Sequence, residues 1–305
     1  MNFRKVYIFP VVFLLLFISS CKKVQKQWHF ERKIMLPIES RPLALAKDGE
    51  TIWFSDPDYF RLFRIDLNGR VLDSIIGIQR PMNIHSDKKS LYIPEFLTDT
   101  IWKYRNGRLN PLQIKKRPQA PAGVSVYGDT VAIADFYNHR IIIQTADTSV
   151  TIGKQGHQDG KLYYPIDVKL RGSKVYVADA YNHRVQVFGF GGKHLKTIGL
   201  NDQINVASGI ELNSQEIAVT DQENDRVLIY GYDGQLFQVL EEGIPTSQTQ
   251  LAAQQGAGPA GVHHEQDQAA GLGFPHLLPN VPRLNQEGGR KSPRTPLYER
   301  GAFRC

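Results

Sequence analysis

The amino-acid sequence predicts an all-β fold built from repeated antiparallel units of four strands. Two observations support this prediction. Short runs rich in β-branched and aromatic residues alternate with turn residues, as between Lys174 and Gly199, where Gly191 and Gly192 separate two such runs. Glycine supplies the positive φ that tight hairpins need, so this stretch is typical of a meander of short strands. The same arrangement recurs along the chain with a period of about 40 residues.

Each repeat carries an acidic residue at the same place. The equivalent acids are Asp56, Glu95, Asp135, Asp179 and Asp221. A residue at constant spacing precedes each acid: Pro42, Pro81, Pro121, Pro165 and Ala207. A residue at constant spacing also follows each acid: Arg61, Thr100, Arg140, Arg184 and Arg226. This regularity predicts that two strands and their turn form a rigid unit in every repeat, whereas the connections between units vary.

The residues after the acid form a recognisable signature in the later repeats. The third and fourth repeats read YNHRI, at Tyr137 to Ile141, and YNHRV, at Tyr181 to Val185, and the fifth has the near copy Asn224-Asp225-Arg226. This pattern resembles the NHL repeat family, whose repeats form the four-stranded blades of a β-propeller, usually with six blades. The first two repeats depart from the signature, with Tyr59-Phe60-Arg61 and Thr98-Asp99-Thr100.

The resemblance implies a six-bladed β-propeller over residues 28–243, with five full repeats visible and the last blade incomplete. Trp28 to Pro37 has the composition of a strand that the five repeats do not need. In ring-closed propellers a strand from one terminus completes the blade begun at the other and removes the exposed edges. We therefore expect this strand to belong to the sixth blade.

Residues 244–305 break the repeat pattern. This tail is rich in Gln, Gly, Ala, Pro and Arg and lacks alternating β-forming residues, so we expect it to be largely disordered. An altered reading frame that replaces the native last blade and a natural extension both remain open as explanations.

The first twenty residues have the pattern of a secretory signal. Arg4 and Lys5 precede an apolar run from Val6 to Ile18, which is short for a membrane span. Ile18-Ser19-Ser20-Cys21 is similar to a bacterial lipobox, in which the cysteine becomes the lipidated first residue. We therefore expect a signal peptide over residues 1–20, lipid such as palmitate on Cys21, a tether over residues 21–27, and a location in the bacterial cell envelope. A free cysteine after an ordinary signal is the alternative.

The charge of the chain is concentrated outside the repeats. The whole sequence has a formal net charge of +7, but basic residues of the signal, the tether and the tail account for this excess. The repeat region is close to neutral and lacks the basic footprint that nucleic-acid binding requires. We expect no nucleic-acid partner, and a membrane contact through the N-terminal lipid.

The candidate ligand-binding residues surround one mouth of the channel: Arg41 and Arg80 precede two of the prolines, Tyr137 and Tyr181 lie in loops, and Asn83 and Asp167 lie on inner strands. Guanidinium forks and aromatic faces around a channel mouth suit a polar ligand, whether a protein, a peptide, a glycan or a small molecule. Ordinary solvated loop residues are the alternative interpretation. The repeated acids and arginines, with His139 and His183, are better explained as structural, because a catalytic group is needed once and not in every blade.

Catalysis is the second hypothesis for function. The propeller resembles the amidating-lyase and lactonase groups, which hold divalent metals in the channel. The comparable inner positions here are Ala44, Asn83, Gly123, Asp167 and Gly209, with His85 as a further inner histidine. Only two of these five positions can ligate, fewer than zinc or a hard cation requires. We therefore expect no catalytic residue, metal or cofactor, and favour a binding or scaffolding module over a metal-dependent enzyme of the lyase or lactonase type.

Overall fold

The computed structural model describes residues 28, 29, 31 and 33–241. The predicted signal peptide at 1–20, the lipidated tether at 21–27 with Cys21, and the predicted disordered tail at 244–305 lie outside the described residues.

The described chain forms five four-stranded antiparallel sheets in sequence order. The first two are β1 (Ala44–Asp48), β2 (Thr51–Asp56), β3 (Arg61–Asp66) and β4 (Val71–Ile76), then β5 (His85–Ser86), β6 (Leu91–Glu95), β7 (Thr100–Arg105) and β8 (Arg108–Pro111). The third is β9 (Pro121–Tyr127), β10 (Thr130–Asp135), β11 (Arg140–Gln144) and β12 (Ser149–Ile152). The last two are β13 (Pro165–Arg171), β14 (Lys174–Asp179), β15 (Arg184–Gly189) and β16 (His194–Ile198), then β17 (Ala207–Leu212), β18 (Glu216–Asp221), β19 (Arg226–Gly231) and β20 (Leu236–Leu240).

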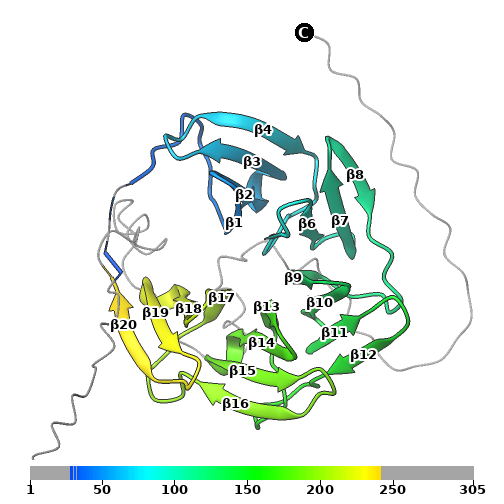
Figure 1. The fold of residues 1–305 in the computed structure, drawn as a ribbon, viewed down its shortest axis with the longest axis vertical. Coiled ribbons are helices and arrows are strands. Elements are labelled where there is room, and N and C mark those ends of the chain that lie inside the picture. The colour runs from blue at the N-terminus through cyan, green and yellow to red at the C-terminus, as the bar shows by residue number, and fades with distance from the viewer. Residues whose placement is uncertain (1–27, 30, 32, 242–305) are drawn as a thin grey trace, which may run out of the picture. The chain divides into compact units, whose positions relative to one another are not determined.

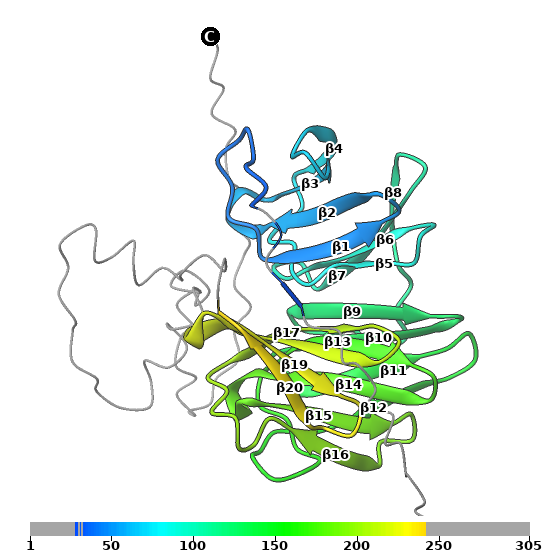
Figure 2. The same ribbon diagram turned by 60° about the vertical axis from the view of Figure 1, so that its left-hand side comes forward.

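Each sheet is one blade of a β-propeller. The first strands of the blades lie toward a common centre and the fourth strands lie outermost, as Figure 1 shows. In Figure 2 the order β13, β14, β15 and β16 can be followed outward. The all-β propeller of four-stranded blades is therefore confirmed. The six-bladed ring is not, because the described residues contain five blades and no sixth copy of the repeat.

The second and third strands of every blade are joined by a tight turn. In three blades this turn is a short 3-10 helix, η1 (Pro57–Tyr59), η2 (Ala180–Asn182) or η3 (Gln222–Asn224). A residue with positive φ ends the turn in all five blades: Phe60, Asp99, His139, His183 and Asp225. Asn and Asp tolerate this left-handed conformation better than a bulky residue does. The position of the signature histidine is therefore a turn position.

The core consists of residues that pack between neighbouring blades. Between the third and fourth blades, Ile141 and Ile143 of β11 form one cluster with Val175, Val177 and Phe188 of the fourth blade, all of them buried. Burying one such side chain contributes about 1.5–3 kcal/mol. Each blade interface thus stabilises both of its blades, as in other repeat folds.

The N-terminal segment covers the face of the first blade that is turned away from the second blade. Ile34, Leu36 and Ile38 pack on a cluster that contains Phe54 and Phe63. None of the described residues between 28 and 37 belongs to a strand, so the prediction of a strand at Trp28 to Pro37 is wrong. Every second side chain, at Ile34, Leu36 and Ile38, packs on the blade. The segment is thus held by side-chain contacts and not by a ladder of backbone hydrogen bonds.

The same segment also contacts the fifth blade. The backbone N–H of Trp28 donates to Gln238 Oε1 at 2.9 Å, and Gln238 Nε2 donates to the carbonyl of Trp28 at 2.8 Å. The Trp28 indole donates to Glu216 Oε2 at 3.0 Å. In Figure 1 this blue stub lies beside β20. Residues near the N-terminus therefore contact both the first and the fifth blade.

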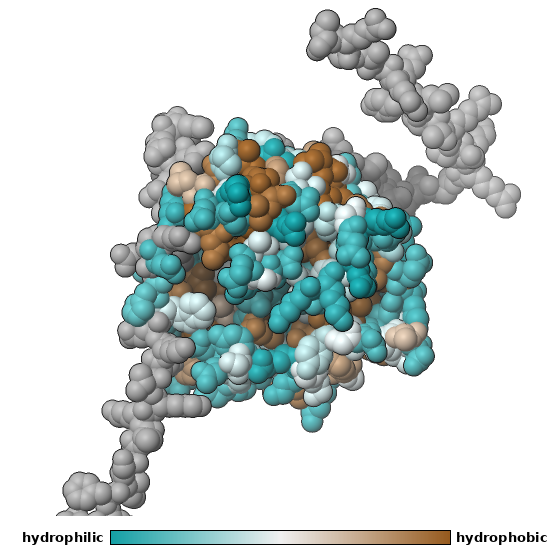
Figure 3. Space-filling model, turned by 45° about the horizontal axis from the view of Figure 1, so that its top comes forward, coloured by the Kyte–Doolittle hydropathy of each residue, from teal (hydrophilic) through white to brown (hydrophobic). Residues whose placement is uncertain are grey.

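The face of the fifth blade that is turned away from the fourth blade is less covered than the equivalent face of the fourth blade. Thr220 is exposed and Ala218 is half-buried, whereas the equivalent residues of the fourth blade, Ala178 and Tyr176, are buried. The first blade and its N-terminal segment also carry several exposed hydrophobic side chains, among them Met35, Leu45, Leu67, Leu72 and Ile76. Figure 3 shows hydrophobic patches in the upper half of its view, interrupted by hydrophilic side chains.

Gly69 is predicted to be required for docking of the N-terminal segment. A Cβ added at Gly69, whose φ is +83°, would lie 2.5 Å from the carbonyl oxygen of Met35. Gly77 has a similar φ of +89° with open space around it, so Gly77→Ala is a matched control. We expect Gly69→Ala to lower the free energy of unfolding by about 1–3 kcal/mol more than Gly77→Ala does. Urea denaturation of both variants measures this difference, and equal losses would contradict the contact.

Candidate functional site

The connections between strands gather at two ends of each blade. At one end lie the links from the second to the third strand and the links between successive blades, because the strands are antiparallel. We call this end the loop face. It comprises residues 39–43, 57–60, 77–81, 96–99, 112–120, 136–139, 153–164, 180–183, 199–206 and 222–225.

A buried carboxylate fixes the loop face in the fourth blade. Asp179 is fully buried and accepts hydrogen bonds from the backbone N–H of Tyr163 at 2.7 Å and from Asn182 Nδ2 at 2.8 Å. It also accepts from Arg184 Nε at 2.9 Å and Gln186 Nε2 at 2.8 Å. Burial raises the pKa of the Asp179 carboxyl, and the hydrogen bonds from its partners oppose that shift. One side chain thereby joins the link between blades to the turn and the third strand.

The equivalent acids make the same contacts in the other blades. Each accepts from a backbone N–H in the preceding link: Arg41 to Asp56 at 3.0 Å, Gln79 to Glu95 at 2.5 Å, Gln119 to Asp135 at 2.7 Å and Asn205 to Asp221 at 2.7 Å. Arginine Nε donates to Asp56, Asp135 and Asp221 at 2.9, 2.6 and 2.7 Å, and Trp102 Nε1 donates to Glu95 at 2.7 Å. The expectation of a structural role for the repeated acid and arginine is confirmed.

His139 also has a structural position. Its Nδ1 lies 3.0 Å from the backbone N of Tyr164 and accepts that N–H, and its ring stacks on Tyr163 with 5.3 Å between centroids. Burial lowers the pKa of His139, which favours the neutral ring that this hydrogen bond needs. His183, the equivalent residue of the fourth blade, is exposed.

Aromatic side chains form a continuous cluster on the loop face. We call the following residues the aromatic cluster: Phe96, Phe136, Tyr137, Tyr163, Tyr164 and Tyr181. Ring centroids of Phe96 and Tyr137 are 5.7 Å apart, those of Phe136 and Tyr164 are 4.8 Å apart, and those of Tyr164 and Tyr181 are 5.1 Å apart. These edge and tilted contacts are the arrangements that aromatic pairs prefer. The cluster brings Tyr137 and Tyr181, two of the predicted ligand-binding residues, together.

The hydroxyl groups of Tyr137, Tyr164 and Tyr181 keep their protons at neutral pH. Burial is the main cause that raises the pKa values of Tyr137, Tyr164 and Tyr181. Each hydroxyl can therefore both donate and accept a hydrogen bond.

Arginines extend the site toward the first blade. Arg80 Nη1 donates to Asp58 Oδ1 at 3.5 Å, and Arg41 Nη1 lies 3.7 Å from Asp58 Oδ2. Burial lowers the pKa of Arg80, while attraction to Asp58 and Tyr137 acts in the opposite direction. Arg80 thus connects the Arg41–Asp58 pair to the aromatic cluster.

Two of the residues that point into this region have an unusual backbone. Arg80 and Tyr164, each directly before the proline that begins the next blade, have φ values of +62° and +52°. This conformation costs of order 1–3 kcal/mol for a residue other than glycine and persists only where other contacts impose it. The hydrogen bonds from Tyr163 to Asp179 and from Tyr164 to His139 supply such contacts.

Glu223 lies at the other end of the site. Its pKa is raised by partial burial and by neighbouring Asp225 and Asp221, and its charge in turn raises the pKa of Tyr181. The loop face therefore carries a line of interacting side chains from the first blade to the fifth, with guanidinium groups at one end and a carboxyl group at the other.

Asn83 and Asp167 lie apart from this line, on or beside the inner strands. Asn83 Nδ2 donates to the carbonyls of Ile166 and Ser208 at 3.0 and 3.4 Å. The carboxylate of Asp167 is buried and accepts from the backbone N–H of Val168 at 2.8 Å and of Ile210 at 3.0 Å. These contacts join the second, fourth and fifth blades across the axis.

A second layer of polar side chains follows along the inner strands. Lys169 Nζ lies 3.4 Å from Asp167 Oδ2 and 3.9 Å from Glu211 Oε2. His85 Nε2 lies 3.0 Å from the carbonyl oxygen of Val126. Burial, with repulsion by Lys169 as a second cause, lowers the pKa of His85 to about 4.

Sequence reasoning missed several members of the site. Tyr164 directly precedes the proline of its repeat, as Arg80 does, so this position could also have predicted Tyr164 as a site residue. Phe96 and Phe136 directly follow the repeated acids, where the fourth blade has Ala180. Asp58 and Glu223 could not have been chosen from their sequence context, because other exposed acids look alike.

The described residues contain no group of three or more His, Cys, Asp or Glu side chains that could hold a metal ion. No helix within the described ranges is long and apolar enough to cross a membrane.

Comparisons with known proteins support the repeat assignment and the fold. A family model described as NHL repeat matches residues 162–188. No curated protein matches the chain. Among solved structures, a streptogramin B lyase is similar with a TM-score of 0.53 at 17% identity, covering 70% of this chain and 72% of the other.

Two further structures show the range of proteins with this fold. A catalytically inactive variant of virginiamycin B lyase from Staphylococcus aureus, with quinupristin, has a TM-score of 0.51 at 14% identity over 68% of this chain and 71% of the other. Nidogen, from a nidogen/laminin complex, has a TM-score of 0.56 at 15% identity over 65% of this chain and 79% of the other. At these identities the likeness concerns the fold alone.

His85 predicts a pH dependence of stability. Its pKa is lowered from 6.5 in the unfolded chain to about 4 in the folded protein, so the unfolded state binds the proton more readily. Stability from the neutral ring is therefore complete above pH 6.5 and is lost as the pH falls toward 4, by about 2–3 kcal/mol at pH 4.5. We expect His85→Gln to remove this part of the loss, and His183→Gln, at an exposed histidine, to retain it. Urea denaturation at pH 7.5 and pH 4.5 measures both, and equal pH dependence in the two variants would contradict the assignment.

Proposed function

Since this chain is an NHL-repeat β-propeller, we propose that it is a binding module whose ligand contacts the loop face, and that it acts without catalysis. The observation that carries this proposal is the line of side chains from Arg41 and Arg80 through the aromatic cluster to Glu223. Members of the line come from all five described blades, so a ligand that follows it can contact each of them.

The chemistry of the line favours an extended polar ligand. Aromatic rings offer flat surfaces to a peptide or a sugar, and protonated tyrosine hydroxyls offer hydrogen bonds of both directions. Arg41 and Arg80 favour a carboxylate or another anionic group at one end. Glu223 favours a donor at the other end. A protein segment, a peptide or a glycan satisfies these requirements.

In this proposal Asn83 and Asp167 stabilise the ligand site by holding the inner strands beneath the loop face. Their polar atoms bind backbone groups of neighbouring blades, which holds the inner strands that carry the loop face. A metal-dependent enzyme of the lyase or lactonase type is the competing hypothesis. Stoichiometric zinc or calcium in the purified protein, lost on replacing Asp167 and Asn83, would favour that hypothesis.

We further propose that the complete molecule has six blades. The half-covered side of the fifth blade, at Ala218 and Thr220, and the contacts of Trp28 with Gln238 and Glu216 support a blade between the fifth and the first. Such a blade would cover the flank that the described residues leave exposed.

Anchoring in the bacterial envelope is also part of the proposal, and it depends on Cys21. Lipid on this residue would hold the propeller at a membrane surface facing the periplasm or the cell exterior. Cys21→Ser is expected to move the protein from the membrane fraction to the soluble fraction without changing its unfolding midpoint. Fractionation after cell lysis measures this, and unchanged membrane association of the variant would contradict lipidation.

Loop-face binding is tested with two mild substitutions and a matched control. Arg41→Ala and Tyr181→Phe remove a guanidinium group and a hydroxyl group from the line. Arg70→Ala removes another exposed, Asp-paired arginine, which lies at the opposite end of the first blade. We expect Arg41→Ala to weaken binding of the ligand selected from peptide and glycan arrays by about tenfold, since it removes a charged hydrogen bond. We expect Tyr181→Phe to weaken it by about fivefold, since it removes a neutral one. Equal signals from the wild type and both loop-face variants would contradict the proposal.

A further inference from the structure

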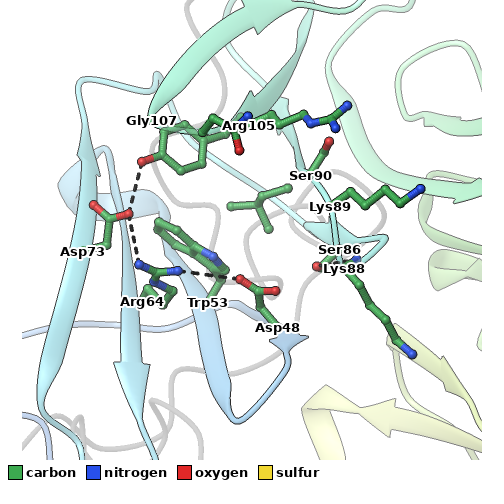
Figure 4. A pocket seen from close by; sticks show the side chains of 13 residues that line it. Asp48, Trp53, Arg64, Asp73, Ser86, Lys88, Lys89, Ser90, Arg105 and Gly107 are labelled. Carbon is green, nitrogen blue, oxygen red and sulfur yellow. Dashed lines mark hydrogen bonds and ion pairs between the residues drawn. The ribbon is translucent and has the colours of Figure 1, made fainter.

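A polar pocket lies between the first two blades, at the end of the strands opposite to the loop face. It has a volume of about 280 Å³. It is lined by the face of the first blade that is turned toward the second blade, and by two turns of the second blade. Figure 4 shows Asp73, Arg64 and Asp48 on one side of it, and Ser86, Lys88 and Lys89 on the other. None of these residues belongs to the line of side chains on the loop face.

The guanidinium group of Arg64 has unused donors in this pocket. Arg64 Nη1 lies 3.9 Å from Asp48 Oδ2 and Arg64 Nη2 lies 3.7 Å from Asp73 Oδ2, distances too long for hydrogen bonds. Arg64 Nε is buried and has no hydrogen-bond partner among the described residues. Its planar group stands over Trp53 at 5.6 Å, so its orientation is set. Its Nη1 and Nη2 groups, whose contacts with Asp48 and Asp73 are longer than hydrogen bonds, can donate to an acceptor of a ligand in the pocket.

The side of the pocket opposite Arg64 carries cationic side chains on a turn whose backbone is fixed by hydrogen bonds. Lys88, Lys89 and Arg105 are exposed, and the described part of the chain offers none of them an ion pair. The turn that bears both lysines is fixed by Asp87, whose Oδ1 accepts from the backbone N–H of Lys89 at 2.9 Å and of Ser90 at 2.7 Å. Unpaired cations on a fixed turn attract an anionic group.

Carboxylates in the same pocket restrict the kind of anion. Asp48 and Asp73 would repel a compact anion, yet both can accept hydrogen bonds from hydroxyl groups. Asp73 already accepts the hydroxyl of Tyr104 at 3.1 Å, which leaves it further acceptor capacity. Trp53 and Tyr104, whose rings are 5.6 Å apart, provide an apolar wall. Anionic, hydroxyl-bearing and partly apolar groups together describe an acidic sugar.

We propose that this pocket binds an acidic monosaccharide unit of the uronic acid class. Its carboxylate lies toward Lys88, Lys89 and Arg105. Its hydroxyl groups lie on the other side, where they donate to Asp48 and Asp73 and accept from Arg64. The site is separate from the loop face and adds a second, sugar-specific contact to the molecule.

The test uses sodium glucuronate as the probe, with glucose and inorganic phosphate for comparison. In titrations of the full chain followed by NMR, we expect glucuronate to bind more tightly than either. Arg105→Ala and the double change Lys88→Ala with Lys89→Ala should each weaken glucuronate binding by about tenfold, the factor for one charge-assisted hydrogen bond. Lys116→Ala, at an exposed lysine outside the pocket, should leave it unchanged.

Asp48→Asn distinguishes a sugar site from a simple anion site. Removal of this negative charge should strengthen phosphate binding, because repulsion falls. It should weaken glucuronate binding, because a charged acceptor of sugar hydroxyls is replaced by a weaker, neutral amide oxygen. Absence of glucuronate binding, equal affinity for glucose or phosphate, or an equal effect of Lys116→Ala would overturn the proposal. Arg41→Ala should not change glucuronate binding, so failure here and failure of the loop-face site are distinguishable.

Discussion

A buried carboxylate at the end of the second strand holds each blade to the link that precedes it. In the fourth blade Asp179 accepts hydrogen bonds from Tyr163, Asn182, Arg184 and Gln186, and no water is needed to satisfy it. Removing such a carboxylate would leave a buried arginine without its partner, which is among the costlier single changes in a protein. The acid recurs for this reason in every blade. The asparagine and arginine of the NHL signature donate hydrogen bonds to it, as Asn182 and Arg184 do in the fourth blade.

The loop face depends on these carboxylates. Because each one fixes the backbone directly before its own blade, the residue in front of the proline can be held with positive φ, as at Arg80 and Tyr164. That conformation directs side chains of different blades toward one another. The binding chemistry can therefore vary in the links and turns while the acid, its arginine and the strand lengths remain the same.

The fold and part of the site could be predicted from the sequence, because both follow local spacing. The recurring acid and proline located the strands, and the position before proline led to Arg80. The uses of Asn83 and Asp167 could not be predicted, since their partners Ile166, Ser208 and Ile210 belong to other blades. The N-terminal segment was expected to be a strand from its composition, but Ile34, Leu36 and Ile38 pack by their side chains instead. The pocket at Arg64 forms between two blades, and no single repeat contains it.

Hydrogen exchange of the link amides tests most directly whether the repeated acids organise the loop face. The amides of Arg41, Gln79, Gln119, Tyr163 and Asn205 lie outside strands, yet each donates to a repeated acid. We predict that they exchange on the order of 100-fold more slowly than the amides of Lys116 and Leu200, which donate to no acid among the described residues. This factor is a difference of roughly 3 kcal/mol in opening free energy. Exchange of the five link amides as fast as that of Lys116 and Leu200 would contradict the account.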